Sequence, residues 1–175
     1  NEKIRFQLSR IQPESPTAGA PPAQGAIVLL PYRPGEMTTL EAWTNQDWEV
    51  LPDGSIQVHN GENRTKREFR DVQLHVEFRI PYQPEERGQS RGNSGVYLQN
   101  YYEVQVLDSF GLEPKNNECG GLYSIAAPEV NVCFPPESWQ TYDIVFRAAR
   151  FDDDGNRTEP ARITVLPNGV KIHEN

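Results

Sequence analysis

The residues best suited to chemistry lie in the stretch GNSGVYLQNYYEVQVLDSFG, residues 92–111. It reads as two alternating strands joined by a turn at residues 99–101, and alternation puts its polar side chains on one face. Carboxylate, amide and phenol groups in one row can transfer protons and bind hydroxyl groups. The row consists of Tyr97, Gln99, Glu103 and Gln105.

Asp108 lies five residues after Glu103, so simple alternation would put the two carboxylates on opposite faces. The adjacent apolar residues Val106 and Leu107 interrupt the period of two. A one-residue bulge there would turn Leu107 inward and return Asp108 to the row of Glu103. We expect these two acids to handle protons. Asn93 is expected in the turn that leads into this face.

A second polar row follows the clearest strand of the sequence, DVQLHVEFRI at residues 71–80. Strict alternation puts His75, Glu77 and Arg79 on the face opposite the apolar positions. If this strand pairs with the strands of residues 92–111 and their polar faces coincide, one sheet carries acids, amides, an arginine, a histidine and tyrosine. That inventory suits a sugar ligand.

A plain solvated face is the competing interpretation, because every half-exposed antiparallel sheet has a polar side. Cross-strand Glu and Arg pairs would stabilise such a face modestly. The composition of these rows favours a site, since they hold Gln, Glu, Asp and Tyr but no Lys.

The elements that would position these residues are strands. The 175 residues include 15 Pro and 13 Gly, and none of the segments has a helical period, so we predict an all-β, two-sheet antiparallel β-sandwich. Residues 1–24 are expected to form an arm or linker and residues 25–175 a single sandwich domain. Strands are predicted at 25–30, 71–80, 95–99, 102–108, 140–148, 160–166 and 170–173, with hairpins at 47–61 and 151–161.

Charge and hydropathy exclude some classes of function. The net charge of −8 and the scattered basic residues disfavour nucleic-acid binding. No apolar run is long enough to cross a bilayer. No basic start followed by an apolar run reads as a signal peptide, so we expect that none existed or that it has been removed. Cys119 and Cys133 match no metal signature and could form either a disulfide or two buried free thiols. A disulfide would indicate the periplasm or the exterior.

Several motifs in order closely resemble the 3-keto-disaccharide hydrolase domain family. They are LHVEFR (74–79), GNSGVY (92–97), YEVQVLDS (102–109), GGLY (120–123), WQTYDI (139–144) and PNGV (167–170). The resemblance implies a concanavalin A-like jelly roll whose concave polar sheet carries the site, and an activity that cleaves 3-keto-glycosides. It also implies a bacterial protein that is periplasmic or secreted. Family domains continue beyond the segment that matches 173–175, so the domain could lack its closing C-terminal strand.

A ketone at C3 acidifies the C2 hydrogen of the sugar, so that a base can form an enolate and expel the C1 substituent before water adds. The reaction needs a base, an acid and a positive group at the C3 oxygen. We predict Glu103 as base or acid, Asp108 as its partner and Arg79 as the enolate stabiliser. Substrate contacts are predicted for His75, Glu77, Asn93, Tyr97, Gln99, Gln105 and Tyr123. A divalent metal held by Asp108, Glu103 or a histidine is possible, although no ligand spacing implies one.

Two other functions fit the same residues. The spacing in EVQVLD is similar to the E-x-D-x-x-E of laminarinase-like retaining glucanases, but its middle acid is an amide. Retaining hydrolysis also requires two carboxyls about 5 Å apart. A non-catalytic, lectin-like carbohydrate-binding module would use the same fold and face. A carbohydrate or glycoside is the expected partner in all three interpretations.

Overall fold

The computed structural model describes residues 13–31, 37–59 and 61–174. The described residues fall into two compact units, one of residues 20–69 and the other of residues 13–19 with 70–174. The regular structure of both units is β-strand, although most of the described residues of 20–69 are irregular, and the described part of the chain adds a single 3-10 turn, η1 (Gly88–Ser90). The all-β class predicted from the sequence is therefore confirmed.

The unit of residues 20–69 holds one short antiparallel ribbon of β1 (Glu49–Val50) and β2 (Ile56–Gln57). The turn between them is closed by the Gly54 amide, which donates to the Leu51 carbonyl at 2.9 Å, as the hairpin prediction required. The predicted strand at 25–30 is wrong. Its apolar side chains Ile27 and Val28 are 49% and 47% exposed, and the segment joins no ladder that would hold it extended.

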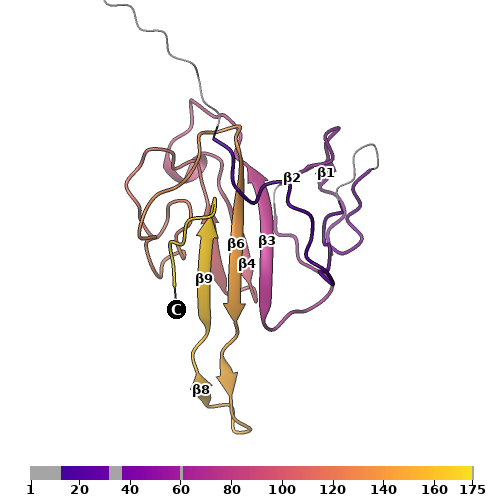
Figure 1. Cartoon of the computed structure of the whole chain (residues 1–175), viewed down its shortest axis with the longest axis vertical. Helices are drawn as coiled ribbons and strands as arrows, with labels where there is room; N and C mark the ends of the chain where they lie inside the picture. Colours follow the sequence, from indigo (N-terminus) through magenta and orange to yellow (C-terminus); the bar gives the residue numbers. More distant parts are fainter. Residues whose placement is uncertain (1–12, 32–36, 60, 175) are drawn as a thin grey trace, which may run out of the picture. The chain divides into compact units, whose positions relative to one another are not determined.

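The larger unit contains a three-stranded antiparallel sheet in the order β3-β6-β9. Its strands are β3 (Val72–Arg79), β6 (Trp139–Arg147) and β9 (Arg162–Pro167), which lie side by side in Figure 1. They confirm three of the predicted strands. Past β6 the chain forms the ribbon of β7 (Arg150–Phe151) and β8 (Arg157–Glu159) around the acidic turn. The strand predicted at 170–173 is not formed. Of these residues, His173 makes an isolated β-bridge to Val165 of β9.

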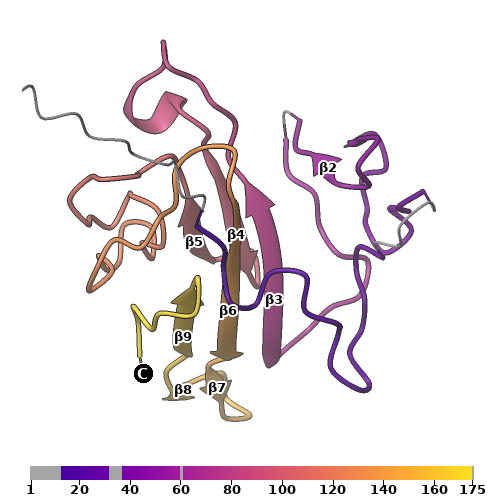
Figure 2. The ribbon, with the colours of Figure 1, turned by 45° about the horizontal axis from the view of Figure 1, so that its top comes forward.

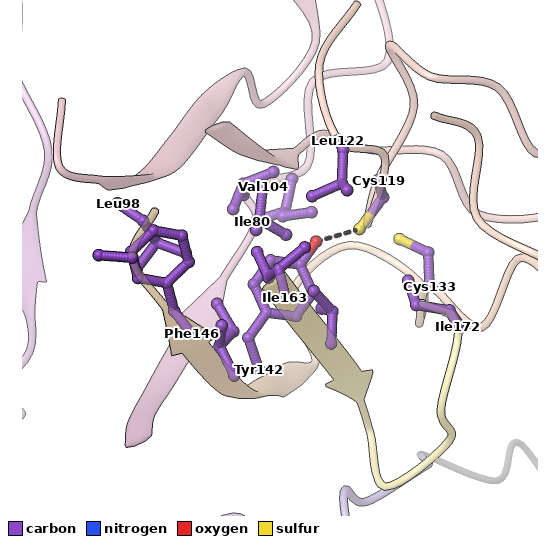
Figure 3. Close-up of a cluster of buried hydrophobic side chains, with 14 residues drawn as sticks. Ile80, Leu98, Val104, Cys119, Leu122, Cys133, Tyr142, Phe146, Ile163 and Ile172 are labelled. Carbon is purple, nitrogen blue, oxygen red and sulfur yellow. Dashed lines mark hydrogen bonds between the residues drawn. The ribbon is translucent and has the colours of Figure 1, made fainter. Parts of the chain in front are cut away.

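The second layer of this unit is the hairpin of β4 (Ser94–Leu98) and β5 (Tyr102–Val106). Residues 99–101 form its turn, in which Gln99 and Asn100 have φ angles of 53° and 54°, the left-handed conformation that tight hairpin turns use. The apolar sides of the hairpin and the sheet bury one core between them (Figure 3), which makes the unit a β-sandwich. The core includes Ile80, Leu98, Val104, Val106, Tyr142, Ile144, Phe146, Ile163, Val165 and Ile172.

Tyr142 joins the two layers by hydrogen bonds as well as packing. Its buried hydroxyl donates to the Gln105 carbonyl at 2.6 Å and contacts the Cys119 sulfur at 3.2 Å (Figure 3). Cys119 and Cys133 are both buried free thiols, so the disulfide alternative is not the one found. The hydrogen bond with Cys119, together with burial, raises the pKa of Cys133 above its ordinary value.

Residues 13–19, which we term the N-terminal strap, lie on the outer face of β6 and β3 (Figure 2). The buried Ser15 hydroxyl is 2.6 Å from the Thr141 hydroxyl, and the Thr17 hydroxyl donates to Asp143 Oδ2 at 2.9 Å. At the end of the strap, the Gly19 amide donates to Glu77 Oε1 at 2.8 Å. These bonds give the outer polar residues of the sheet partners within the chain.

Candidate functional site

The two polar rows expected to share one face lie on opposite sides of the sandwich. β3 pairs with β6, with His75 opposite Asp143, and it does not pair with β4 or β5. The apolar faces of β3 and of the hairpin meet in the core, so their polar faces point in opposite directions. Alternation fixes the face of a strand but not its partner, which is why the expectation of one shared face was wrong.

The β3 row is occupied by interactions within the chain. His75 Nδ1 is 2.7 Å from Asp143 Oδ1, and His75 Nε2 is 3.3 Å from Glu77 Oε1. Burial lowers the pKa of His75, but the hydrogen bonds and charges of the two carboxylates outweigh it and raise the pKa overall. The Arg79 guanidinium lies over the Trp139 ring at 5.0 Å. The structure therefore does not bring His75, Glu77 and Arg79 to the face of Glu103.

This cluster predicts a pH dependence of stability. Because the pKa of His75 is raised in the folded chain, its contribution is complete below the unfolded value of 6.5 and is lost as pH rises through the folded value. His173 has a lowered pKa and acts with the opposite sign, so the comparison must be between wild type and His75→Gln. At acidic pH we expect the free energy of unfolding of wild type to exceed that of the variant by less than about 1 kcal/mol, since the side chains of the cluster are about one-third exposed.

Urea unfolding of both proteins at about pH 5.5 and about pH 8.5 measures this effect, because the two values lie on either side of an ordinary histidine pKa. The stability difference between wild type and His75→Gln should shrink at the higher pH. An equal difference at both values would contradict the assignment of a charged His75 to this cluster.

On the hairpin, one carboxylate lies between two tyrosines. Tyr97 and Glu103 are directly opposite partners on β4 and β5, and the Tyr123 amide donates to the Glu103 carbonyl at 3.0 Å on the other side of β5. The neighbouring Leu122 bridges Val104 in the core, so alternation puts Tyr123 on the outer face with Glu103. Tyr97 is 53% exposed and Tyr123 is 39% exposed, which leaves aromatic surface open on both sides of the carboxylate.

A second row, Gly95, Gln105 and Gly121, runs beside the first. Gln105 is the partner of Gly95 across the hairpin, and the backbone N–H of Gln105 donates to the Gly121 carbonyl at 2.9 Å. The Glu103 carboxylate folds over Gly95, where a Cβ atom would be 2.1 Å from Glu103 Oε1. The space over Gly95 is therefore filled by a side chain of the protein. We call Gly95, Tyr97, Glu103, Gln105 and Tyr123 the hairpin site.

Two other predicted contact residues border this site. The exposed Asn93 donates from its side-chain nitrogen to the Gln89 carbonyl at 2.9 Å, next to the start of β4. Gln99 is exposed in the turn that joins β4 to β5 and does not continue the row along the strands.

Asp108 does not return to the row of Glu103. β5 ends at Val106, and Leu107 is buried as expected, but Asp108 is only 7% exposed. Its Oδ2 atom forms an ion pair with Arg91 Nε at 3.0 Å, and the Arg91 Nη2 group donates to the Asp108 carbonyl at 3.0 Å. The predicted partnership of Asp108 and Glu103 is therefore replaced by a buried ion pair with Arg91.

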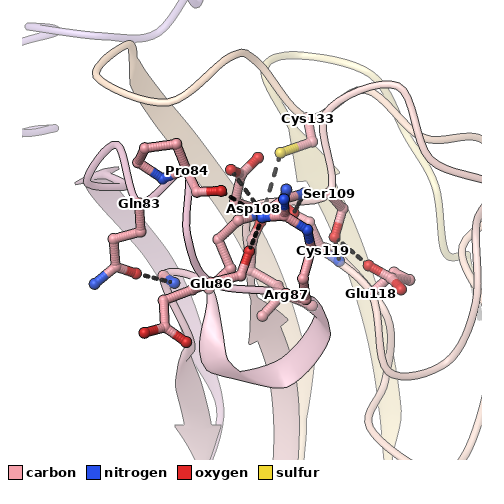
Figure 4. A network of polar contacts seen from close by, with 12 residues as sticks. Gln83, Pro84, Glu86, Arg87, Asp108, Ser109, Glu118, Cys119 and Cys133 are labelled. Atoms are coloured by element: carbon pink, nitrogen blue, oxygen red, sulfur yellow. Dashed lines mark hydrogen bonds and ion pairs between the residues drawn. The ribbon is translucent and has the colours of Figure 1, made fainter.

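The backbone after Asp108 is held by a further set of polar contacts. The Ser109 hydroxyl donates to Glu118 Oε2 at 2.5 Å and accepts from the Cys119 amide at 2.9 Å (Figure 4). The sequence offered no sign of the role of Arg91, because the turn η1 brings it to Asp108 from a stretch that reads as an ordinary polar loop.

The described residues contain no group of three or more His, Cys, Asp or Glu side chains that could hold a metal ion. The cluster of His75, Glu77 and Asp143 does not converge on one point, since each carboxylate contacts a different nitrogen of the ring. The structure therefore assigns no ligands to the divalent metal considered from the sequence. In the part of the chain that it describes, no helix has the length and apolarity to span a membrane.

Comparison with known proteins decides the family. Residues 26–175 match the family described as the 3-keto-alpha-glucoside-1,2-lyase-like domain. The chain belongs to this family. The match covers the hairpin site and its flanks, whereas the N-terminal strap lies outside it. The resemblance noted from the sequence motifs is thus confirmed.

Two solved structures from Parabacteroides distasonis are similar to this lyase-like domain. One, described as a "putative glycosyl hydrolase", is 36% identical with a TM-score of 0.75, and the match covers 85% of this chain and 64% of that protein. This chain therefore spans less than two thirds of the length of that relative. A second structure with the same description is 17% identical with a TM-score of 0.50, covers 78% of this chain and 68% of its own, and shares the fold. No curated protein matches the chain.

Proposed function

We propose that this domain is a carbohydrate-active enzyme that cleaves 3-keto-glycosides at the hairpin site. The observation that carries the proposal is the position of Glu103 between the exposed Tyr97 and Tyr123. The aromatic rings offer apolar surface on which a sugar ring can pack. The carboxylate between them is a base that can remove a hydrogen from that ring. The match to a 3-keto-α-glucoside lyase-like family supports the choice of substrate.

Glu103 acts as the base that removes the hydrogen at C2 of the keto sugar. The electron pair of the C2–H bond forms an enolate with the C3 ketone, and its collapse breaks the C1–O bond and expels the C1 substituent, whose oxygen takes up a proton from solvent. Water then adds across the C1–C2 double bond, with its oxygen on C1 and a proton on C2. Asp108 is not given a proton-transfer role, because Arg91 holds it in a buried ion pair. An exported, periplasmic location is part of the proposal and rests on the resemblance alone.

A direct test incubates the protein with a chromogenic 3-keto-glucoside and with the unoxidised parent glucoside, and follows the released aglycone with and without EDTA. We expect release from the keto compound only. Release from the parent would instead support an ordinary glycoside hydrolase. Binding of both without release would support a lectin-like module, and sensitivity to EDTA would add a metal to the reaction.

A further inference from the structure

Gln105 cannot contact a sugar directly, although its residue type suggested that role. Its side chain is only 1% exposed, on the face of β5 that also carries Glu103. The backbones of β4 and of the segment at Gly121 flank it, and its side-chain amide is 3.0 Å from Gln89 Oε1. A polar group buried this completely serves other protein groups.

The Glu103 carboxylate is within reach of the Gln105 side-chain amide in one of the two orientations of that amide. In the first orientation, the amide nitrogen donates to Gln89 Oε1 at 3.0 Å and to Asn93 Oδ1 at 3.3 Å, but the amide oxygen lies 2.9 Å from the Ser94 carbonyl oxygen, where neither atom can donate. In the other, the nitrogen donates to Ser94 O at 2.9 Å and to Glu103 Oε1 at 3.2 Å, and the oxygen faces Gln89 Oε1 at 3.0 Å, so this orientation requires the Gln89 amide to turn and donate. A hydrogen bond to a carboxylate is stronger than one between neutral groups and fixes the direction of the acceptor.

Gly95 supplies the space that this arrangement needs. A Cβ atom on residue 95 would lie 2.1 Å from Glu103 Oε1 and 2.8 Å from both Cδ and Cγ. Real Cβ atoms do not approach so closely, so any larger residue would push the carboxylate off β4. The backbone of Gly95 has no positive φ angle, and its requirement is therefore one of space.

We propose that Gly95 and Gln105 are positioning residues that hold Glu103 Oε1 against β4. This leaves Oε2, which accepts no hydrogen bond from the described residues, as the oxygen that meets the substrate. The inference rests on the proposed function for its catalytic consequence but not for the contact itself. A displacement of about 1 Å at a reacting group can reduce turnover by about 100-fold.

The catalytic test measures kcat and KM for Gly95→Ala and Gln105→Leu with the 3-keto-glucoside. We expect kcat to fall by about 100-fold in each variant, with KM changed by less than about 3-fold, because the substrate does not touch either side chain. In the Glu103→Gln background neither substitution should lower the residual rate further. Full kcat in both single variants would overturn the proposal.

A thermal cycle tests the contact without any turnover. Gly95→Ala should lower the melting temperature by about 4 °C in wild type and by less than about 1 °C in a Glu103→Ala background, where the overlap is absent. Equal losses in both backgrounds would overturn the positioning role. If the 3-keto-glucoside is not cleaved at all but the cycle shows this coupling, the positioning inference stands and the proposed reaction fails.

Discussion

Glu103→Gln should reduce turnover of a 3-keto-glucoside by about 1,000-fold, within the range that general base catalysis contributes. The amide fills the same volume over Gly95 but cannot accept the C2 proton. Substrate binding should change by less than about 3-fold, because Tyr97 and Tyr123 are untouched. Steady-state kinetics and equilibrium binding to the purified variant measure the two effects separately.

Glu77→Gln is the matched control for this substitution. Both glutamates were expected at the site from the sequence, but Glu77 lies on the outer face of β3, where it accepts from the Gly19 amide. Its substitution should leave turnover within about 3-fold of wild type, as expected for a residue away from the reacting groups. A large loss in Glu77→Gln combined with full activity in Glu103→Gln would move the site to the opposite face of the sandwich.

Arg91→Met should destabilise the folded domain by about 3 kcal/mol. The side chains of Arg91 and Asp108 are 22% and 8% exposed, so removal of the arginine leaves a carboxylate with little access to water and without its partner. Breaking a buried pair from one side costs about 3–5 kcal/mol, and the partial exposure of Arg91 puts this case at the lower end. Urea unfolding measures the loss as a shift of the midpoint.

Two further variants show whether the cost comes from the unpaired charge. Arg91→Met combined with Asp108→Asn removes both charges and should recover part of the stability. Arg157→Met, at an exposed position of β8, should change stability by less than about 0.5 kcal/mol. A loss in Arg91→Met no greater than that of Arg157→Met would show that the ion pair contributes nothing.

Local pattern predicted the strands of the larger unit well. The alternation of residues 71–80 and the turn at Gln99 and Asn100 depend on neighbours in the sequence, and β3, β4 and β5 formed close to their expected bounds. The apolar run at 25–30 had the composition of a strand, but a strand also needs a partner that its own sequence does not specify.

The content of the site depended on contacts that the sequence does not reveal. Tyr97, Glu103 and Tyr123 were predicted and do lie together. Tyr97 and Glu103 face each other because register within a hairpin follows from its turn, whereas Tyr123 is placed by the bridge of Leu122 to Val104, which the turn does not determine. The pairing of β3 with β6 removed three other candidates from that face. The Arg91 ion pair removed Asp108, since both residues come from irregular segments whose approach is decided by packing.

The N-terminal strap gives a structural reason for polar residues that had suggested a ligand. His75 is bound to Glu77 and to Asp143 of β6, and these two carboxylates accept hydrogen bonds from residues 13–19, so the polar composition of this row serves the fold. Glu103 also has neighbours within the chain in Gly95 and Gln105, but Tyr97 and Tyr123 beside it remain substantially exposed, so this face offers surface to a ligand.

The most direct measurement is the fate of the C2 hydrogen of a 3-keto-glucoside cleaved in deuterium oxide, followed by NMR. Abstraction by Glu103 predicts that newly released 3-keto-glucose carries solvent deuterium at C2. This deuterium should appear at a higher rate than the background exchange at C2 of free 3-keto-glucose, measured in the presence of the Glu103→Gln variant. Product that keeps its original C2 hydrogen would show direct hydrolysis of the glycosidic bond and would contradict the account.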